Sequence, residues 1–110
     1  YQQAKGGRHF RVSDRIKAIV GRNERENNFL KLYTRGRHAF VIDDHPSALT
    51  LAEIRGVPEE SDLGTLASIA ARYCDAPPGS PVRVQHQYAD LRCDILAPAA
   101  SDADLDRWRV

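Results

Sequence analysis

The amino-acid sequence predicts an α+β domain, with a mixed or antiparallel sheet, two main helices packed on one face and a short C-terminal helix. Two observations support this fold class. Short segments with the alternation or the continuous apolar character of strands occur in pairs. Segments with helical spacing of apolar residues separate these pairs, which is typical of an α+β sheet. The expected order of elements is therefore β-β-α-β-β-α-β-β-α.

The first third of the chain predicts two strands and a helix. Residues 1–7 are rich in Gln and Gly and are expected to form a linker or a disordered terminus. Residues 8–12 alternate between polar and apolar, so they predict a half-buried strand, and the apolar-rich segment 16–20 predicts its partner. A helix is expected after Asn23 and up to about Tyr33, and Gly36 is suited to close it.

The middle of the chain predicts a second strand pair and the clearest helix. Residues 39–42 form a short continuous apolar run, which indicates a buried strand. Residues 49–54 are compatible with a strand or a helix. A strand is favoured, because a helix would have to stop within two turns at Gly56. Pro58 and the two glutamates that follow it mark a helix start, and apolar residues recur at helical spacing over residues 63–74.

The last third of the chain predicts a hairpin and a short helix. Residues 82–86 alternate as a strand, and residues 91–95 are expected to pair with them across a turn. Ser101 is expected to cap a terminal helix that contains Leu105 and Trp108.

Length and composition are those of one folded domain, expected over residues 8–110. The sequence is 42% apolar and 28% charged, and no apolar stretch approaches the ~20 residues that cross a membrane. The chain opens at Tyr1 and contains no methionine, so we expect a piece of a longer protein whose neighbouring domain holds the main activity. Cys74 and Cys93 lack the spacing of a metal site, and two reduced thiols in a cytoplasmic protein are expected.

The charges divide unevenly along the chain. Residues 1–42 contain ten Lys and Arg against three acids, whereas residues 43–110 contain six against twelve. A basic half next to an acidic half predicts a polarised surface, and a basic patch is the footprint of polyanion binding. The alternative is that folding mixes the two halves in space, so that the field cancels.

The junction between the strand 16–20 and the first helix has the chemistry of an anion site. Gly21 suits a sharp exit from the strand, and Asn23 is a good N-cap with Glu26 three residues later. Arg22 would then lie beside the free amides of a helix N-terminus, which favour a phosphate. The alternative is an ordinary junction whose arginine faces water.

Basic residues of the first third of the chain, together with Asn23, form the candidate nucleic-acid-binding set. Lysine and arginine contacts to phosphates supply affinity that depends on salt rather than on base sequence. Aromatic residues suited to stacking are fewer, namely Phe10, Tyr33 and Tyr88, and each of them is equally suited to the core, so binding to backbone and shape is favoured over base readout. The candidates are Arg8, Arg11, Lys17, Arg22, Asn23, Arg25, Lys31, Arg35 and Arg37, with Gly21 and Asn27 as structural residues of the motif.

Catalytic and metal-binding patterns are weak in this chain. His86 and Cys93 are expected on partner strands and would be a thiol–imidazole pair or an incidental one. The run Asp43-Asp44-His45 contains metal-ligand residue types, but such residues before a proline are typical of a solvated turn. No catalytic residue, metal site or cofactor is therefore expected.

Several segments resemble the RNA-binding domain of the NFACT family. Segment 20–30, which reads Val-Gly-Arg-Asn-Glu-Arg-Glu-Asn-Asn-Phe-Leu, is similar to the family's strand ending in Gly-Arg-Asn and the helix after it. Segment 63–74 resembles its second helix, and residues 82–84 resemble the strand that follows. Among the variants of this domain, these segments resemble the one attached at the C-terminus of PP-loop proteins, which are ATP-dependent tRNA-modifying proteins of the thiouridine-forming kind.

Two departures limit what the resemblance implies. The main family domain carries a Trp-x-His signature on the strand after the first helix, where this chain has Phe40-Val41-Ile42. The variant's Phe-Pro-Gly-Pro-like loop corresponds to residues 45–48, and Ser47 stands at its glycine. The matching positions are Gly21, Arg22, Asn23 and Asn27.

The resemblance implies an accessory domain that holds structured RNA, most plausibly tRNA, for an adjacent catalytic domain of the same chain. Such a domain would be cytoplasmic, would need no cofactor or membrane, and would not itself be an enzyme. One alternative is a protein-interaction module that docks a catalytic domain or a sulfur carrier. Another is an auxiliary domain in which Cys74 or Cys93 acts as a sulfur-relay thiol.

Overall fold

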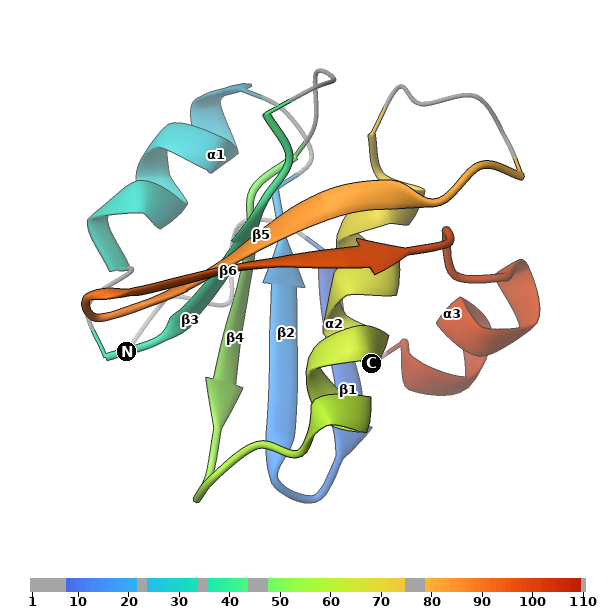
Figure 1. Ribbon diagram of the computed structural model, residues 1–110, viewed down its shortest axis with the longest axis horizontal. Coiled ribbons are helices and arrows are strands. Elements are labelled where there is room, and N and C mark those ends of the chain that lie inside the picture. The colour runs from blue at the N-terminus through green and yellow to red at the C-terminus, as the bar shows by residue number, and fades with distance from the viewer. Residues whose placement is uncertain (1–7, 22–23, 34–35, 44–47, 75–78, 110) are drawn as a thin grey trace.

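A computed structural model describes residues 8–21, 24–33, 36–43, 48–74 and 79–109. Within them, six antiparallel strands form one sheet in the order β1-β2-β4-β3-β5-β6. Figure 1 shows that the β5–β6 hairpin crosses the other strands steeply, so the sheet is strongly twisted. The strands are β1 (Arg8–Ser13), β2 (Ile16–Val20), β3 (His38–Val41), β4 (Thr50–Ile54), β5 (Val82–Tyr88) and β6 (Leu91–Ala97).

Alternation along the strands gives the sheet two different faces. On β2, Ile16, Ala18 and Val20 are buried on one face, whereas Lys17 is exposed on the other. We call the face of Ile16, Ala18 and Val20 the helix face and the face of Lys17 the outer face. The registers β1–β2 and β2–β4 continue both faces across the sheet.

The main core lies between the helix face and two helices, α2 (Glu60–Arg72) and α3 (Asp102–Trp108). In α2, Leu66 and Ile69 are fully buried because apolar residues at helical spacing form one stripe. Leu105 is the buried residue of α3, and Ser101 Oγ accepts a hydrogen bond from the amide of Asp104 at 3.1 Å. The expected Ser101 cap is therefore confirmed.

The first helix, α1 (Glu24–Leu30), lies on the outer face, so the expectation of two main helices on one face was wrong. Leu30 packs with Ala39, Leu49 and Leu51, which belong to the outer face, and forms a second, smaller core. Leu51 and Ala52 of β4 are both buried although they point to opposite faces, so this part of the strand is covered on both sides. Figure 1 shows α1 beside the upper ends of β3 and β4, away from α2.

The order of elements is the predicted one, with a short 3-10 helix, η2 (Lys31–Tyr33), added after α1. The strand preferred for residues 49–54 is confirmed as β4. The predicted hairpin is longer than expected, because Gln87 and Tyr88 also pair and leave a two-residue turn at Ala89 and Asp90. Gly36 has a φ of +76°, the left-handed conformation suited to the end of a helical segment.

Candidate nucleic-acid interface

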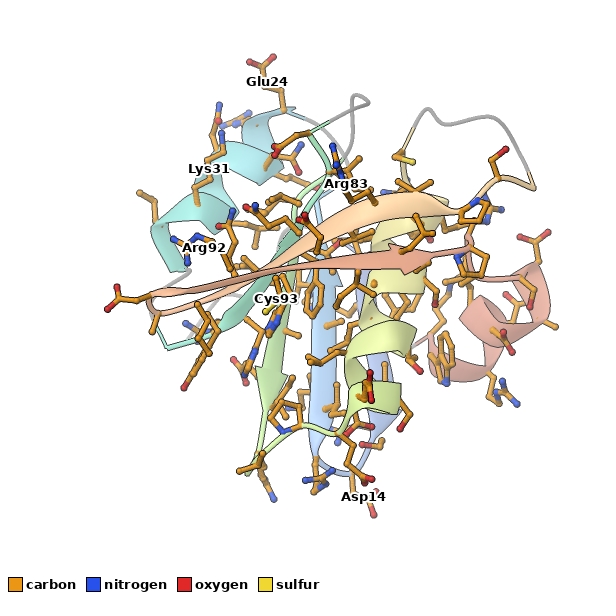
Figure 2. The ribbon with its side chains drawn as sticks, viewed as in Figure 1. Asp14, Glu24, Lys31, Arg83, Arg92 and Cys93 are labelled. Carbon is orange, nitrogen blue, oxygen red and sulfur yellow. The ribbon has the colours of Figure 1, made fainter. Side chains whose placement is uncertain are left out.

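Several basic residues line a shallow hollow of about 500 Å³ at the β1–β2 turn end of the sheet. Figure 2 labels Asp14, one of these lining residues, at that end of the molecule. We call it the basic hollow, and its lining residues are Arg11, Asp14, Arg15, Lys17, Gly36, Arg37, Glu53, Ile54 and Arg55. It brings together three of the predicted RNA-binding residues, namely Arg11, Lys17 and Arg37.

Strand register explains why these three residues meet. Arg11 lies opposite Lys17 on β1 and β2, and Lys17 lies opposite Glu53 on β4. All of them point to the outer face, because side chains two residues apart share a face. Arg37 then reaches the same row, and its Nε donates a hydrogen bond to Glu53 Oε1 at 3.1 Å.

Arg15 and Arg55 complete the hollow and were missed from the sequence. The amide of Arg55 donates to the carbonyl of Arg15 at 2.9 Å, and Arg15 Nη1 donates to the carbonyl of Arg55 at 3.1 Å. Arg15 also forms an ion pair of 3.3 Å with Asp62 of α2. These two arginines are 40 positions apart, and only the pairing of β2 with β4 brings them together.

The hollow has an excess of positive charge. Five cations line it against two carboxylates. Arg37 takes Glu53 as a partner and Arg15 takes Asp62. Within the described part of the chain, Arg11, Lys17 and Arg55 have no carboxylate within ion-pair distance. Like charges directly opposite each other on paired strands are destabilising, and Arg11 and Lys17 are such a pair.

The glycine at the strand–helix junction fixes α1 to the sheet. The amide of Gly21 donates to the carbonyl of Leu49 at 3.1 Å, and the amide of Leu49 donates to Asn27 Oδ1 at 3.1 Å. A Cβ at Gly21 would lie 2.0 Å from that same oxygen, so only glycine fits there. Gly21 and Asn27 thus join the end of β2, the start of β4 and α1.

The remaining predicted residues are dispersed. Arg25 and Lys31 are exposed on α1 and η2, and Figure 2 shows Lys31 projecting at the upper left. Arg8 lies at the other end of β1, with its guanidinium 4.6 Å from the ring centroid of Tyr73. It is therefore separate from the basic hollow. Arg22, Asn23 and Arg35 lie outside the described residues.

The sheet separates opposite charges in the described structure. The helix layer over residues 59–73 and 101–109 contains six carboxylates and three arginines. Its arginines are paired within the layer, for example Arg72 with Asp102 at 2.6 Å, and this pairing raises the pKa of Arg72. On the outer face, β5 and β6 add Arg83 and Arg92, both labelled in Figure 2.

The alternative site residues do not converge on a catalytic arrangement. His86 Nε2 lies 2.8 Å from His38 Nδ1, and both rings are buried. Cys93 lies opposite His86 in the register but is exposed, and Cys74 Sγ donates to the carbonyl of Ala71 at 3.1 Å. Asp43 is exposed, while Asp44 and His45 lie outside the described residues.

Two further features are absent from the described residues. They contain no group of three or more His, Cys, Asp or Glu placed to hold a metal ion. Nor do they contain a helix with the length and apolar character needed to cross a membrane.

Comparisons with known proteins agree with this architecture. A family model described as "NFACT protein RNA binding domain" matches residues 7–109. The C-terminal part of the fibronectin/fibrinogen-binding protein from Streptococcus suis superposes with a TM-score of 0.80 at 14% identity. The alignment covers 96% of this chain and 50% of that one, so the likeness is one of fold and this chain spans half of the solved chain. No curated protein matches the sequence.

Proposed function

The chain belongs to the NFACT RNA-binding domain family, and from this premise we propose that it holds tRNA for a PP-loop, thiolation-type tRNA-modifying domain. The family match supports a general role in RNA binding. The resemblance of segment 20–30 to the variant attached to PP-loop proteins supports the narrower setting. In this proposal the domain is a cytoplasmic accessory unit that positions the RNA, and the neighbouring domain carries out the chemistry.

The basic hollow is the observation that carries this proposal. Burying or crowding like charges costs free energy, and a bound polyanion removes that cost. Arg11, Lys17 and Arg55 lack carboxylate partners in the described structure and remain available for phosphates. Arginine and lysine contacts to phosphates fix the position of a folded RNA without reading its bases.

The outer face gives the RNA a wider surface than the hollow alone. Arg25 and Lys31 are exposed at one side of it, and Arg83 and Arg92 lie on its β5–β6 part. The acidic helix layer faces the other way, so a polyanion approaching the domain is oriented before contact. This arrangement suits a domain that receives a large, structured RNA.

A salt titration of tRNA binding tests the proposal. Replacing Arg11 and Lys17 by Ala is expected to weaken binding on the order of tenfold at low salt and to reduce the log–log salt slope by about one unit per lost contact. The matched control replaces Arg107 and Arg109 by Ala, because these arginines lie in the helix layer. Equal affinity and slope for both double variants would contradict an interface at the hollow.

The catalytic setting requires the full-length protein. There, the Arg11 and Lys17 double variant is expected to raise the KM for tRNA and leave the kcat and the tRNA-independent use of ATP unchanged. A protein-interaction module without RNA contact would instead show unchanged tRNA KM and binding to its partner that persists in high salt. That outcome would replace the proposal.

A further inference from the structure

Four rings from β3 and β5 form one aromatic column on the helix face, made of two stacked pairs that a hydrogen bond between the two histidines joins. Phe40 and His86 lie 4.9 Å apart between ring centroids, and His86 and His38 lie 5.0 Å apart. Tyr88 then stacks on His38 at 4.0 Å with an interplanar angle of 7°. Exposure rises along the column, from 0% at Phe40 to 37% at Tyr88. The column therefore begins in the core and ends at the surface.

The middle of the column is rigid. His38 Nδ1 and His86 Nε2 share a hydrogen bond of 2.8 Å, which fixes the plane of each imidazole ring. Burial lowers the pKa of His38 to about 4 and also lowers the pKa of His86. Both rings are neutral near pH 7, so no charge repulsion opposes the hydrogen bond between them. The oriented ring of His38 is the support on which the phenol ring of Tyr88 lies parallel.

Tyr88 is the exposed end of the column. Among the described residues, its ring contacts one other ring, that of His38. Tyr88 ends β5 at the hairpin turn, and its cross-strand neighbour Leu91 is 60% exposed. This tip thus presents an aromatic face and an aliphatic side chain to solvent, where polar residues are usual.

The turn beyond Tyr88 is braced by an arginine. Ala89 has a φ of +52°, a conformation that costs free energy for a residue other than glycine. Arg92 Nη1 donates to the carbonyls of Ala89 and Leu91 at 2.8 and 2.7 Å, which holds this turn in place. In the described structure Arg92 has no carboxylate partner, so its charge remains available next to the tip.

We propose that the exposed ring of Tyr88 is a stacking platform for one unpaired base of the bound RNA, with Arg92, whose guanidinium lies at the turn, contacting the RNA backbone from the outer face. An exposed aromatic ring beside a cation is the usual arrangement for holding single-stranded RNA, because every base has a stacking face. The proposal rests on the RNA-binding function. It adds a contact that recognises an unpaired nucleotide, which the basic hollow does not provide.

The tip and the basic hollow lie at the same end of β3, on opposite faces of the sheet. Arg37 in the hollow and His38 in the column are consecutive residues of the chain, at the start of β3. In Figure 1 the hairpin tip and the acidic helix α3 lie at opposite sides of the molecule. An RNA whose backbone occupies the hollow can therefore pass over this end of the sheet and place a neighbouring unpaired base at the tip, away from α3.

Two RNAs of equal length distinguish the platform from the hollow: a blunt hairpin and a hairpin with an unpaired extension that carries 2-aminopurine. Tyr88→Leu keeps an apolar side chain on His38 but removes the aromatic ring. It is expected to weaken binding of the extended RNA on the order of tenfold, to abolish the quenching of 2-aminopurine, and to leave blunt-hairpin affinity and salt slope unchanged. Tyr88→Phe is expected to retain binding and quenching. Leu96→Ala, an exposed apolar residue of β6 on the outer face, is the matched control.

The outcomes separate this inference from the proposed function. If the unaltered protein binds neither RNA, the RNA-binding proposal itself fails. If it binds both equally, or if Tyr88→Leu binds the extended RNA and quenches 2-aminopurine like the unaltered protein, the platform is wrong and the hollow stands. If Tyr88→Leu reduces binding to both RNAs alike, Tyr88 has a general structural role and the platform is also wrong.

Discussion

At the scale of single residues, Gly21 shows how a sequence motif becomes a structural constraint. Its position next to Asn27 leaves no room for a methyl group, since the nearest oxygen would be 2.0 Å away. That oxygen also accepts the hydrogen bond from the amide of Leu49. The Gly-Arg-Asn pattern in the sequence therefore has at least one purely architectural member.

Gly21→Ala is expected to lower the free energy of unfolding by about 1–3 kcal/mol, because Asn27 must move and release Leu49. Chemical denaturation measures this change. Gly64→Ala is the matched control, because a Cβ there meets nothing within 4 Å. In the interior of α2 it is expected to raise stability by up to about 1 kcal/mol. A Gly21→Ala protein as stable as the unaltered one would refute the close contact.

The His38–His86 pair predicts a dependence of stability on pH. The folded-state pKa of His38 is about 4, against 6.5 for a free imidazole, so the unfolded chain binds more protons below pH 6.5. The contribution of these histidines to the free energy of unfolding is therefore complete above pH 6.5 and declines as the pH falls toward 4. The loss amounts to about 1.4 kcal/mol for each unit by which folding lowers a pKa.

Denaturation at a series of pH values checks this expectation. Replacing His38 and His86 together by Phe keeps aromatic rings in the column but removes both titrating groups, so the decline is expected to flatten. His9→Gln is the control and is expected to keep the decline. A decline of the same size in the double Phe variant would show that other groups cause it.

At the scale of elements, α3 has the N-cap that the local sequence predicts. Ser101 was identified from its position before a short helical segment, and its Oγ accepts the amide of Asp104. Leu105 packs in the main core. Arg109, just after α3, forms an isolated antiparallel β-bridge with Phe10 of β1. The cap, the packing of Leu105 and the bridge together hold the C-terminal segment to the sheet.

Ser101→Ala is expected to reduce the free energy of unfolding by about 1 kcal/mol through loss of the cap, while Ser101→Asp is expected to retain stability. Thermal unfolding measures both changes. Ser61→Ala, at an exposed position in the first turn of α2, serves as the control and is expected to have little effect. Equal effects at both serines would mean that the cap of α3 contributes nothing specific.

At the scale of the whole molecule, the sheet separates a basic outer face from an acidic helix layer. This separation predicts which side of the domain an RNA meets. On adding tRNA, the backbone amide signals of Arg11, Lys17 and Arg37 are expected to shift in NMR spectra, whereas those of α3 remain in place. Signal shifts concentrated in α3 would place the RNA on the helix layer and would contradict the proposed orientation.

The sequence by itself determined the order of the elements and the Ser101 cap, and it favoured a strand over a helix at residues 49–54, because alternation, helical spacing and capping depend on neighbours in the chain. The tertiary structure alone decided which face α1 covers, and it decided that Arg15 and Arg55 join Arg11 and Lys17 in one hollow. It also placed His38 against Tyr88. The physical reason is that strand pairing and the packing of α1 on the sheet set these contacts between residues far apart in the chain, and a local sequence pattern contains no information about either.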